Sequence, residues 1–426
     1  MISFSVQSFG CRVNQAEVFA WTNQLQEKGF RYERNCSKSD LVIVNSCTLT
    51  SRADRDVRKF IRSLLRANPR ARVIVTGCYV ERAYQEWKEW PHLWRIYPNQ
   101  DKKKIIQDIV SSLDSRNSKR SEIVKAYRAR ALIKIQEGCN YACTFCVVPR
   151  VRGSSISFKR EQILSQIRKF LSQGFREIVL TGINICHYGL DLCPATSLLD
   201  LLRDIESLEE LGRIRLSSLD PRFLPSSLVD HLVDSQKICP HFHFSLQAGS
   251  DRILSRMGRK IKVKTYQEIL SYFRQNLPQA SLGADIIAGF PGESEQDFTQ
   301  TYRFLENSPL TYFHVFSYSP RPGTPASKWP QIREKEKKKR TECLRKLSAK
   351  KNFEFRFSFL EKELEAIVIK KEKDGSQFLT SNYIKVWGPS CDHREGEKVK
   401  IKITEVSPQK TKGKIIYPLV RSSIQI

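Results

Sequence analysis

Three cysteines stand close together near the middle of the 426-residue chain. Cys139, Cys143 and Cys146 form a Cys-x3-Cys-x2-Cys triplet, and the apolar stretch 131–135 ends four residues before it. Thiolates held this close on one loop are typical metal ligands. A 4Fe-4S cluster has four irons that each need an outer ligand, so three cysteines leave one iron open to bind another molecule. The triplet therefore indicates a cluster site with an open iron.

A structural zinc site is the alternative for the same residues. Cys-x2-Cys is half of a zinc ribbon, but zinc needs a fourth ligand, usually from a second Cys-x2-Cys or a His pair at a set distance. No such pair follows the triplet at a matching spacing. The sequence favours the cluster and leaves zinc as the weaker hypothesis.

A second set of cysteines, Cys11, Cys47 and Cys78, follows three strand-like runs near the start of the chain. These runs alternate with helical patterns in the order 2–8, 15–28, 41–45, 54–67 and 73–76. A βαβαβ pattern predicts a small parallel sheet, and ligands of such sheets lie beyond the carboxyl ends of the strands. The three cysteines are therefore expected to meet at one edge and to form a second cluster site with an open iron. Three small buried hydrophobic residues are the alternative.

The totals indicate a basic protein. Lys and Arg number 72 against 45 Asp and Glu, a formal net charge of +27. Such an excess favours a polyanionic partner such as nucleic acid, although a generally basic proteome is the alternative. The twelve cysteines come without a leading apolar segment or any uncharged apolar stretch of 18 residues. We therefore expect a cytoplasmic protein without disulfides or membrane contact.

The residues from 128 to 355 alternate strands and helices. Strands are expected at 131–135, 177–180, 213–217, 241–246, 282–288 and 312–318, and helices at 159–173, 197–208, 225–234, 263–276 and 294–307. Six strands of this kind are too few for a closed eight-stranded barrel, so a partial, open TIM-like (β/α)6 barrel is predicted. On the fourth strand, His241 and His243 point to the same face. We interpret them as hydrogen-bonded core residues rather than ligands.

The segments around this barrel define the remaining parts of an α/β chain. The predicted division is 1–112 for the parallel-sheet domain, 113–127 for a basic linker, 128–355 for the barrel and 356–426 for a last domain. Lys102 to Lys104 are expected in a helix tail, which an exposed linker follows. A basic helix at 332–351 either is simply solvated or contacts RNA phosphates. Short β-rich stretches after residue 357 predict a small antiparallel β-barrel.

Taken in order, these motifs resemble the methylthiotransferase family of radical S-adenosylmethionine enzymes over nearly the whole chain. Within that family the sequence is most similar to the branch that acts on tRNA threonylcarbamoyladenosine. The resemblance is carried by GCRVNQAE at Gly10, VNSCTLT at Val44, TGCY at Thr76, LIKIQEGCNYACTFC at Leu132, EIVLTGIN at Glu177, GFPGE at Gly289, FSYSPRPGTPA at Phe316 and SNYIKV at Ser381.

The resemblance implies two 4Fe-4S clusters and S-adenosyl-L-methionine as cofactors. Cys139, Cys143 and Cys146 would hold the cluster that cleaves the cofactor. An auxiliary cluster on Cys11, Cys47 and Cys78 would deliver sulfur. Cofactor contacts are expected near five residues at the carboxyl ends of the barrel strands: Gly182, Asn184, Gln247, Ile286 and Gly289.

The implied reaction converts N6-threonylcarbamoyladenosine beside the tRNA anticodon to its 2-methylthio form. The adenine C2 hydrogen is unactivated, so a cofactor must carry the difficult step. The implied partners are tRNA, a reductant protein such as flavodoxin or ferredoxin, and a sulfur donor. The last domain would be an RNA-binding TRAM domain. The sequence departs from the family pattern at Arg150, where an aromatic residue is expected, and at Ser245 and Ala248.

Three other functions remain open from the sequence. Methylthiolation of N6-isopentenyladenosine in tRNA would use the same clusters. A ribosomal-protein methylthiotransferase would act on an aspartate side chain, and the basic charge favours tRNA over it. A non-catalytic RNA-binding iron-sulfur or zinc protein is the alternative from another class.

Overall fold

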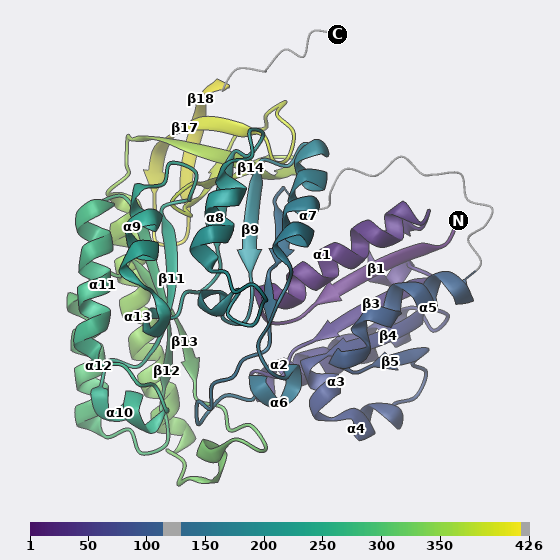
Figure 1. The fold of residues 1–426 in the computed structure, drawn as a ribbon, viewed down its shortest axis with the longest axis horizontal. Helices are drawn as coiled ribbons and strands as arrows, with labels where there is room; N and C mark the ends of the chain where they lie inside the picture. Colours follow the sequence, from purple (N-terminus) through teal and green to yellow (C-terminus); the bar gives the residue numbers. More distant parts are fainter. Residues whose placement is uncertain (114–128, 419–426) are drawn as a thin grey trace.

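The computed structural model describes residues 1–113 and 129–418, and three folded parts follow one another along the chain (Figure 1). The predicted linker at 113–127 lies outside the described residues except for Leu113. None of the helices in these ranges is long and apolar enough to cross a membrane.

The first part is a parallel sheet with strand order β2-β1-β3-β4-β5. Its strands are β1 (Ser3–Ser8), β2 (Arg31–Tyr32), β3 (Leu41–Ser46), β4 (Arg72–Gly77) and β5 (Arg95–Tyr97), and its main helices are α1 (Arg12–Glu27), α2 (Ser51–Ala67) and α5 (Ile105–Ser112). Strand β3 is buried at every position, as expected for a central strand covered on both faces. The predicted sheet is confirmed, whereas β2 and β5 are too short to leave a sequence pattern.

The second part is the open barrel. Strands β6 (Ala131–Lys134), β9 (Glu177–Thr181) and β10 (Arg213–Leu216) form one parallel sheet, and β11 (His241–Gln247), β12 (Ser281–Ala288) and β13 (Tyr312–Ser317) form another. Parallel bridges from Ile214 to Ile238 and from Leu219 to Phe244 join the two sheets. The predicted partial (β/α)6 arrangement is confirmed.

Helices cover the outside of this barrel at the predicted places: α7 (Arg160–Ser172), α8 (Leu198–Glu206), α9 (Ser226–Asp234), α11 (Val263–Asn276) and α12 (Glu295–Asn307). A capping box starts α12, where the Ser294 and Asp297 side chains bond each other's backbone N–H groups. Helix α1 of the first part joins the same core, because Phe19 packs its ring against Phe170 and Phe175 of the barrel. The first two parts therefore share one packed boundary.

The last part is a closed barrel with strand order β14-β15-β16-β18-β17. Its strands are β14 (Glu363–Glu372), β15 (Gly375–Thr380), β16 (Lys385–Gly388), β17 (Lys398–Val406) and β18 (Thr411–Pro418). The pairs are antiparallel as predicted, except for the parallel contact that joins β16 to β18. Strand β15 was not expected, because GSQFLT has no apolar run.

The basic helix α13 (Glu334–Phe357) ends six residues later than the sequence predicts. Its additional turns are stabilised by packing, since Phe355 contacts the core of the closed barrel and stacks edge-on against Phe359. The closed barrel also docks on the amino-terminal ends of β9 and β10 (Figure 1). There Arg213 and Arg215 donate hydrogen bonds to main-chain carbonyls of residues 379–381.

Candidate active site

The first cysteine set lies at the carboxyl edge of the parallel sheet. Cys11 caps α1 after β1, Cys47 follows β3, and Cys78 begins the short helix α3 (Cys78–Arg82) after β4. Burial raises the pKa of the Cys47 thiol to about 12, and the nearby Cys11 and Cys78 act in the same direction. The structure thus brings these three thiols within electrostatic range of one another. Their role as cluster ligands stays a prediction.

Glycine lets the cysteine loops approach one another. Gly10 has φ +85°, and a Cβ at this position would collide with the Sγ of Cys47. Gly77 has φ +102°, and a Cβ there would collide with the backbone of Ser46. Only glycine fits at either position without a shift of the neighbouring strand. Burial keeps these thiols protonated when no metal is bound. A soft metal centre binds the thiolate form and displaces that proton, so buried thiols at this edge are suited to it.

The second cysteine set lies on the loop between β7 (Gln136–Glu137) and α6 (Val148–Arg152). The Cys139 N–H donates to the Gly153 carbonyl over 3.0 Å, and the Cys146 N–H donates to the Cys143 carbonyl over 3.0 Å. Burial raises the pKa of Cys146 to about 12, and the neighbouring Cys143 and Cys139 act in the same direction. Thr144 fastens the loop to the barrel, since its hydroxyl donates to the Arg256 carbonyl over 2.8 Å.

The two cysteine sets are neighbours across the boundary between the sheet and the barrel. Cys78 packs against Val147 and Val151, which flank the start of α6 just after the second set. At the end of the same helix, Arg152 donates from Nε to the Sγ of Cys78 over 3.2 Å. Cys78 is therefore in direct contact with the segment that follows the second set.

A buried charged group holds this boundary together. Glu17 of α1 accepts from Lys102 at 2.6 Å, Lys134 at 3.0 Å and Arg152 at 3.1 Å. Burial alone would raise the pKa of Glu17, but these three cations outweigh it and hold the pKa well below its usual range. The Lys102 side chain is buried against Glu17 and Trp21, a role that the sequence did not reveal. Its position in a run of three lysines concealed the ion pair.

Residues at the carboxyl ends of the barrel strands include polar atoms without partners. Among the described side chains, the buried oxygens of Thr181, Asn184 and Ser217 have no hydrogen-bond partner. Gln247 has φ +77° beside a register shift in β11, a strained conformation for a residue other than glycine. Unpaired buried oxygens and a strained backbone at strand ends fit a bound polar cofactor.

The other predicted cofactor contacts lie differently. Gly182 packs closely against Gln136 and Ile185 at the end of β9. Gly289 has φ +73°, and a Cβ there would collide with the Lys337 side chain of α13. Ile286 belongs to the core between sheet and helices, whereas Asp285 is half-buried on the other face of β12. No contact of these residues with a cofactor is tested by the structure.

Arginines near the second cysteine set were missed from the sequence. Asp220, after β10, accepts two hydrogen bonds from Arg259, both of 3.0 Å, and several from Arg222, the shortest of 2.7 Å. Arg222 also lies over the ring of Tyr141, between the first two cysteines of the triplet. Arg259 and Asp220 are 39 positions apart, so local spacing gave no signal for their ion pair.

The three departures from the family pattern have structural partners. Arg150 lies against Gly323, where a Cβ would meet its guanidinium at 2.6 Å. The Ser245 carbonyl accepts from Tyr266 over 3.1 Å and also from Arg259. Ala248 is fully buried in the barrel core.

The two histidines of β11 are hydrogen-bonded, as predicted from the sequence. His241 Nε2 lies 2.8 Å from the Tyr312 hydroxyl, and His243 Nδ1 lies 2.9 Å from the Ser218 hydroxyl. Both are buried, and both rings lie near Tyr312. Within the described parts of the chain, no three His, Cys, Asp or Glu side chains are arranged to hold a single metal ion.

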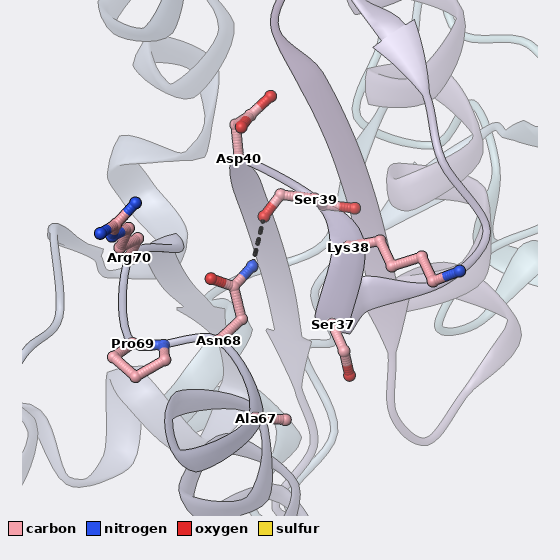
Figure 2. Close-up of a pocket in the computed structure, with 8 residues that line it drawn as sticks. All are labelled: Ser37, Lys38, Ser39, Asp40, Ala67, Asn68, Pro69 and Arg70. Carbon is pink, nitrogen blue, oxygen red and sulfur yellow. Dashed lines mark hydrogen bonds between the residues drawn. The ribbon is translucent and has the colours of Figure 1, made fainter.

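A surface cavity of about 300 Å³ lies at the opposite end of the parallel sheet from the cysteines. Figure 2 shows its lining from the segments before β3 and β4, with the hydrogen bond from Asn68 to the Ser39 carbonyl. It contains none of the predicted site residues.

Comparison with known proteins identifies the two larger parts. Residues 133–305 match the radical SAM superfamily, and residues 3–96 match a family described as uncharacterized protein family UPF0004. A solved radical S-adenosylmethionine methyltransferase, TsrM from Kitasatospora setae, has a similar fold. Its TM-score is 0.53 at 15% identity, over 77% of this chain and 75% of that one.

Curated relatives extend the likeness over the full length. The threonylcarbamoyladenosine tRNA methylthiotransferase of Aquifex aeolicus is 36% identical over 94% of this chain and 98% of its own. The threonylcarbamoyladenosine tRNA methylthiotransferase of Bacillus subtilis is 32% identical over 98% of this chain and 97% of its own. The tRNA-2-methylthio-N6-dimethylallyladenosine synthase of Dictyoglomus thermophilum is 33% identical over 98% of this chain and 99% of its own. Enzymes of this kind use S-adenosylmethionine with a 4Fe-4S cluster, and methylthiotransferases carry an additional cluster. The chain therefore belongs to the radical S-adenosylmethionine tRNA methylthiotransferase family.

Proposed function

We propose that the protein methylthiolates N6-threonylcarbamoyladenosine beside the anticodon of tRNA, at adenine C2. The observation that carries this proposal is the likeness, over nearly the whole of both chains, to two relatives named for this substrate. The likeness spans the sheet with its three cysteines, the barrel with its triplet and the closed barrel.

In this proposal the six cysteines hold two 4Fe-4S clusters. Cys139, Cys143 and Cys146 bind one in the barrel domain, 128–355, and Cys11, Cys47 and Cys78 bind the other in the first domain, 1–112. When bound, the clusters and S-adenosylmethionine supply the one-electron chemistry and the sulfur that an unactivated C–H bond requires. Arg152 holds Cys78 against the start of the barrel, so the substrate base would lie between the two sets.

The remaining residues of the proposal bind cofactor and RNA. Gly182, Asn184, Gln247, Ile286 and Gly289 would lie along the cofactor. Exposed lysines on α13 are available to tRNA phosphates, because only part of the basic run is turned inward: Lys337 and Arg340 are buried and paired with glutamates. The closed barrel, 356–426, would add RNA contacts as a TRAM domain. A reductant protein such as flavodoxin or ferredoxin, and a sulfur donor, complete the reaction.

Methylthiolation of N6-isopentenyladenosine is the second candidate, favoured by the relatives named dimethylallyladenosine synthases. Mass spectrometry of nucleosides separates the two. Reconstituted protein, reductant and S-adenosylmethionine are incubated without oxygen with tRNA carrying one or the other modified adenosine. We expect a methylthio mass gain on threonylcarbamoyladenosine alone. A gain on isopentenyladenosine alone would move the chain to the second candidate, and a gain on neither, with cofactor cleaved, would point to a protein substrate.

A further inference from the structure

The inner face of the open barrel is polar and partly open to solvent. We use this name for His241, His243, Asp285, Tyr312, His314 and Phe316, which lie on β11, β12 and β13. Along β13 the exposure alternates, with Phe313 and Val315 buried in the core and His314 and Phe316 exposed. Asp285 lies beside His314 in the strand register. The residues that alternate with them on these strands, such as Phe242, Ala284 and Val315, belong to the hydrophobic core, so this face points to the opposite side of the sheet.

A cation from another domain is directed at this face. Arg12 is the first residue of α1 and follows Cys11 directly. Burial raises the pKa of Asp285 to about 7, and the charge of Arg12 is the opposing influence on it. Burial likewise lowers the pKa of His243 and His314, and Arg12 lowers both further. One guanidinium therefore lies within electrostatic range of side chains on all three strands.

The guanidinium of Arg12 is held by an aromatic residue of the closed barrel. It donates to the Tyr383 hydroxyl over 3.1 Å and lies 5.6 Å from the centre of that ring. Tyr383 is fixed in turn, because its ring stacks on His241 at 4.0 Å and Arg215 lies over it at 5.1 Å. Its backbone adopts φ +72°, a conformation that a tyrosine takes only when its surroundings impose it. Arg12 is thus positioned rather than free to rotate into solvent.

Arg12 has no carboxylate partner, whereas most of the arginines that are fully buried do. In the described residues, six of the seven buried arginines pair with Glu17, Asp54, Glu177, Asp220 or Glu293, and the seventh, Arg356, donates to main-chain carbonyls, Asn352 and Thr411. In the part of the chain that the structure describes, no carboxylate lies within ion-pair distance of Arg12, and its hydrogen-bond partner is the Tyr383 hydroxyl. A half-buried cation without a counter-ion is unfavourable, and an anionic ligand would remove that cost.

We propose that Arg12 binds the carboxylate of the threonylcarbamoyl group and thereby selects this substrate over isopentenyladenosine. The inference rests on the proposed function. The threonyl group ends in a carboxylate, which the planar guanidinium can bind through two parallel N–H donors. The isopentenyl group is a hydrocarbon without charge and would leave the cation unpaired. Since Arg12 follows Cys11, this carboxylate would be bound next to the first cysteine set.

The test compares two substrates that differ only in this charge. Anticodon stem-loops carry threonylcarbamoyladenosine or its methyl ester, and kcat/KM for methylthiolation is measured with reconstituted protein. Equilibrium binding of both is measured alongside by fluorescence anisotropy. The native protein is expected to prefer the acid. Arg12→Gln should lower kcat/KM and affinity for the acid by about 10- to 100-fold, the loss expected for hydrogen bonds to a charged group, and change those for the ester by less than about threefold.

Two further variants complete the design. Arg12→Lys keeps the charge and should recover part of the preference. Arg55→Gln makes the same change at an exposed position of α2 and should leave the acid-to-ester ratio unchanged. Two measurements establish that the clusters are intact in each variant. They are the iron content and the formation of 5'-deoxyadenosine, the product of S-adenosylmethionine cleavage.

The outcomes separate the inference from the function on which it rests. If Arg12→Gln keeps the native acid-to-ester ratio, or loses both substrates equally with intact clusters, Arg12 does not bind the carboxylate. If the native protein modifies neither the acid nor the ester, the proposed function itself is wrong.

Discussion

Arg152 Nε lies 3.2 Å from Cys78 Sγ, so one side chain that follows the barrel's cysteine triplet contacts a cysteine of the parallel sheet. The same guanidinium binds Glu17 and the Asn14 side chain. A single buried cation therefore contacts both parts of the boundary that carry the two cysteine sets.

Arg152→Ala should destabilise the protein and loosen the first cysteine set. Breaking a buried ion pair completely costs about 3–5 kcal/mol, and the loss here should be smaller because Glu17 keeps Lys102 and Lys134. We expect a lower thermal midpoint and loss of iron from one cluster. Arg152→Lys keeps the charge but not the forked geometry and should show the smaller loss of iron. Unchanged iron in the alanine variant would contradict this role.

Variants of single cysteines should show that the two clusters have different roles. Cys143→Ala should abolish deoxyadenosine formation, whereas Cys47→Ala should spare part of it and stop sulfur insertion. Both products are quantified by liquid chromatography with mass spectrometry. Loss of both activities in the Cys47 variant would argue against separate roles.

Substrate binding should weaken above neutral pH because of Asp285. Its pKa is raised to about 7, so the carboxyl is protonated below this pH and becomes an anion facing Arg12 above it. The histidines facing it, His243 and His314, have lowered pKa values and stay neutral. At pH 8 only about a tenth of the protein is in the competent form, so the Kd for the acid stem-loop should rise about tenfold.

The control for this prediction is Asp285→Asn, which cannot ionise. Its Kd for the acid stem-loop should stay flat from pH 6 to 8. A pH-dependence shared by both proteins would assign the titration to another group.

Glu177→Gln should detach the closed barrel from the open one. Glu177 is buried, but Arg215, Arg213 and Arg130 outweigh burial and hold its pKa below the usual range. Its stabilising effect is therefore full above the unfolded pKa of about 4.3 and is lost as the pH falls below it.

The free energy of unfolding of the variant should be lower by about 3–5 kcal/mol at neutral pH, and this difference should shrink progressively in acid. Thermal unfolding at pH 7 and pH 3, with limited proteolysis after α13, measures both effects. An equal loss at the two pH values would mean that the ionised carboxylate is not the stabilising group.

The architecture followed from the sequence because its signals are local. The strands of the open barrel begin and end within a residue or two of the predicted positions, since each apolar run is bounded by turn residues. The cysteines of both sets were identified because they follow strand ends or share a loop. The β15 strand and the extension of α13 were missed, because packing against distant residues stabilises them.

The charged residues of the site could not be predicted in the same way. Lys102 and Glu17 are 85 positions apart, and Arg152 and Glu17 are 135 apart. Arg12 meets Tyr383 across 371 positions. In each case the sequence contains the residue but nothing that distinguishes it from an exposed charge, because the partner is brought to it only by the packing of separate domains.

The central claim is that the protein acts at adenine C2 of threonylcarbamoyladenosine, and an isotope experiment tests it most directly. A stem-loop with deuterium at C2 is incubated with the reconstituted protein, and the deoxyadenosine and the nucleoside are analysed by mass spectrometry. We predict deoxyadenosine one mass unit heavier, together with a methylthio gain and loss of the deuterium from the nucleoside. Unlabelled deoxyadenosine with no methylthio product would contradict the account.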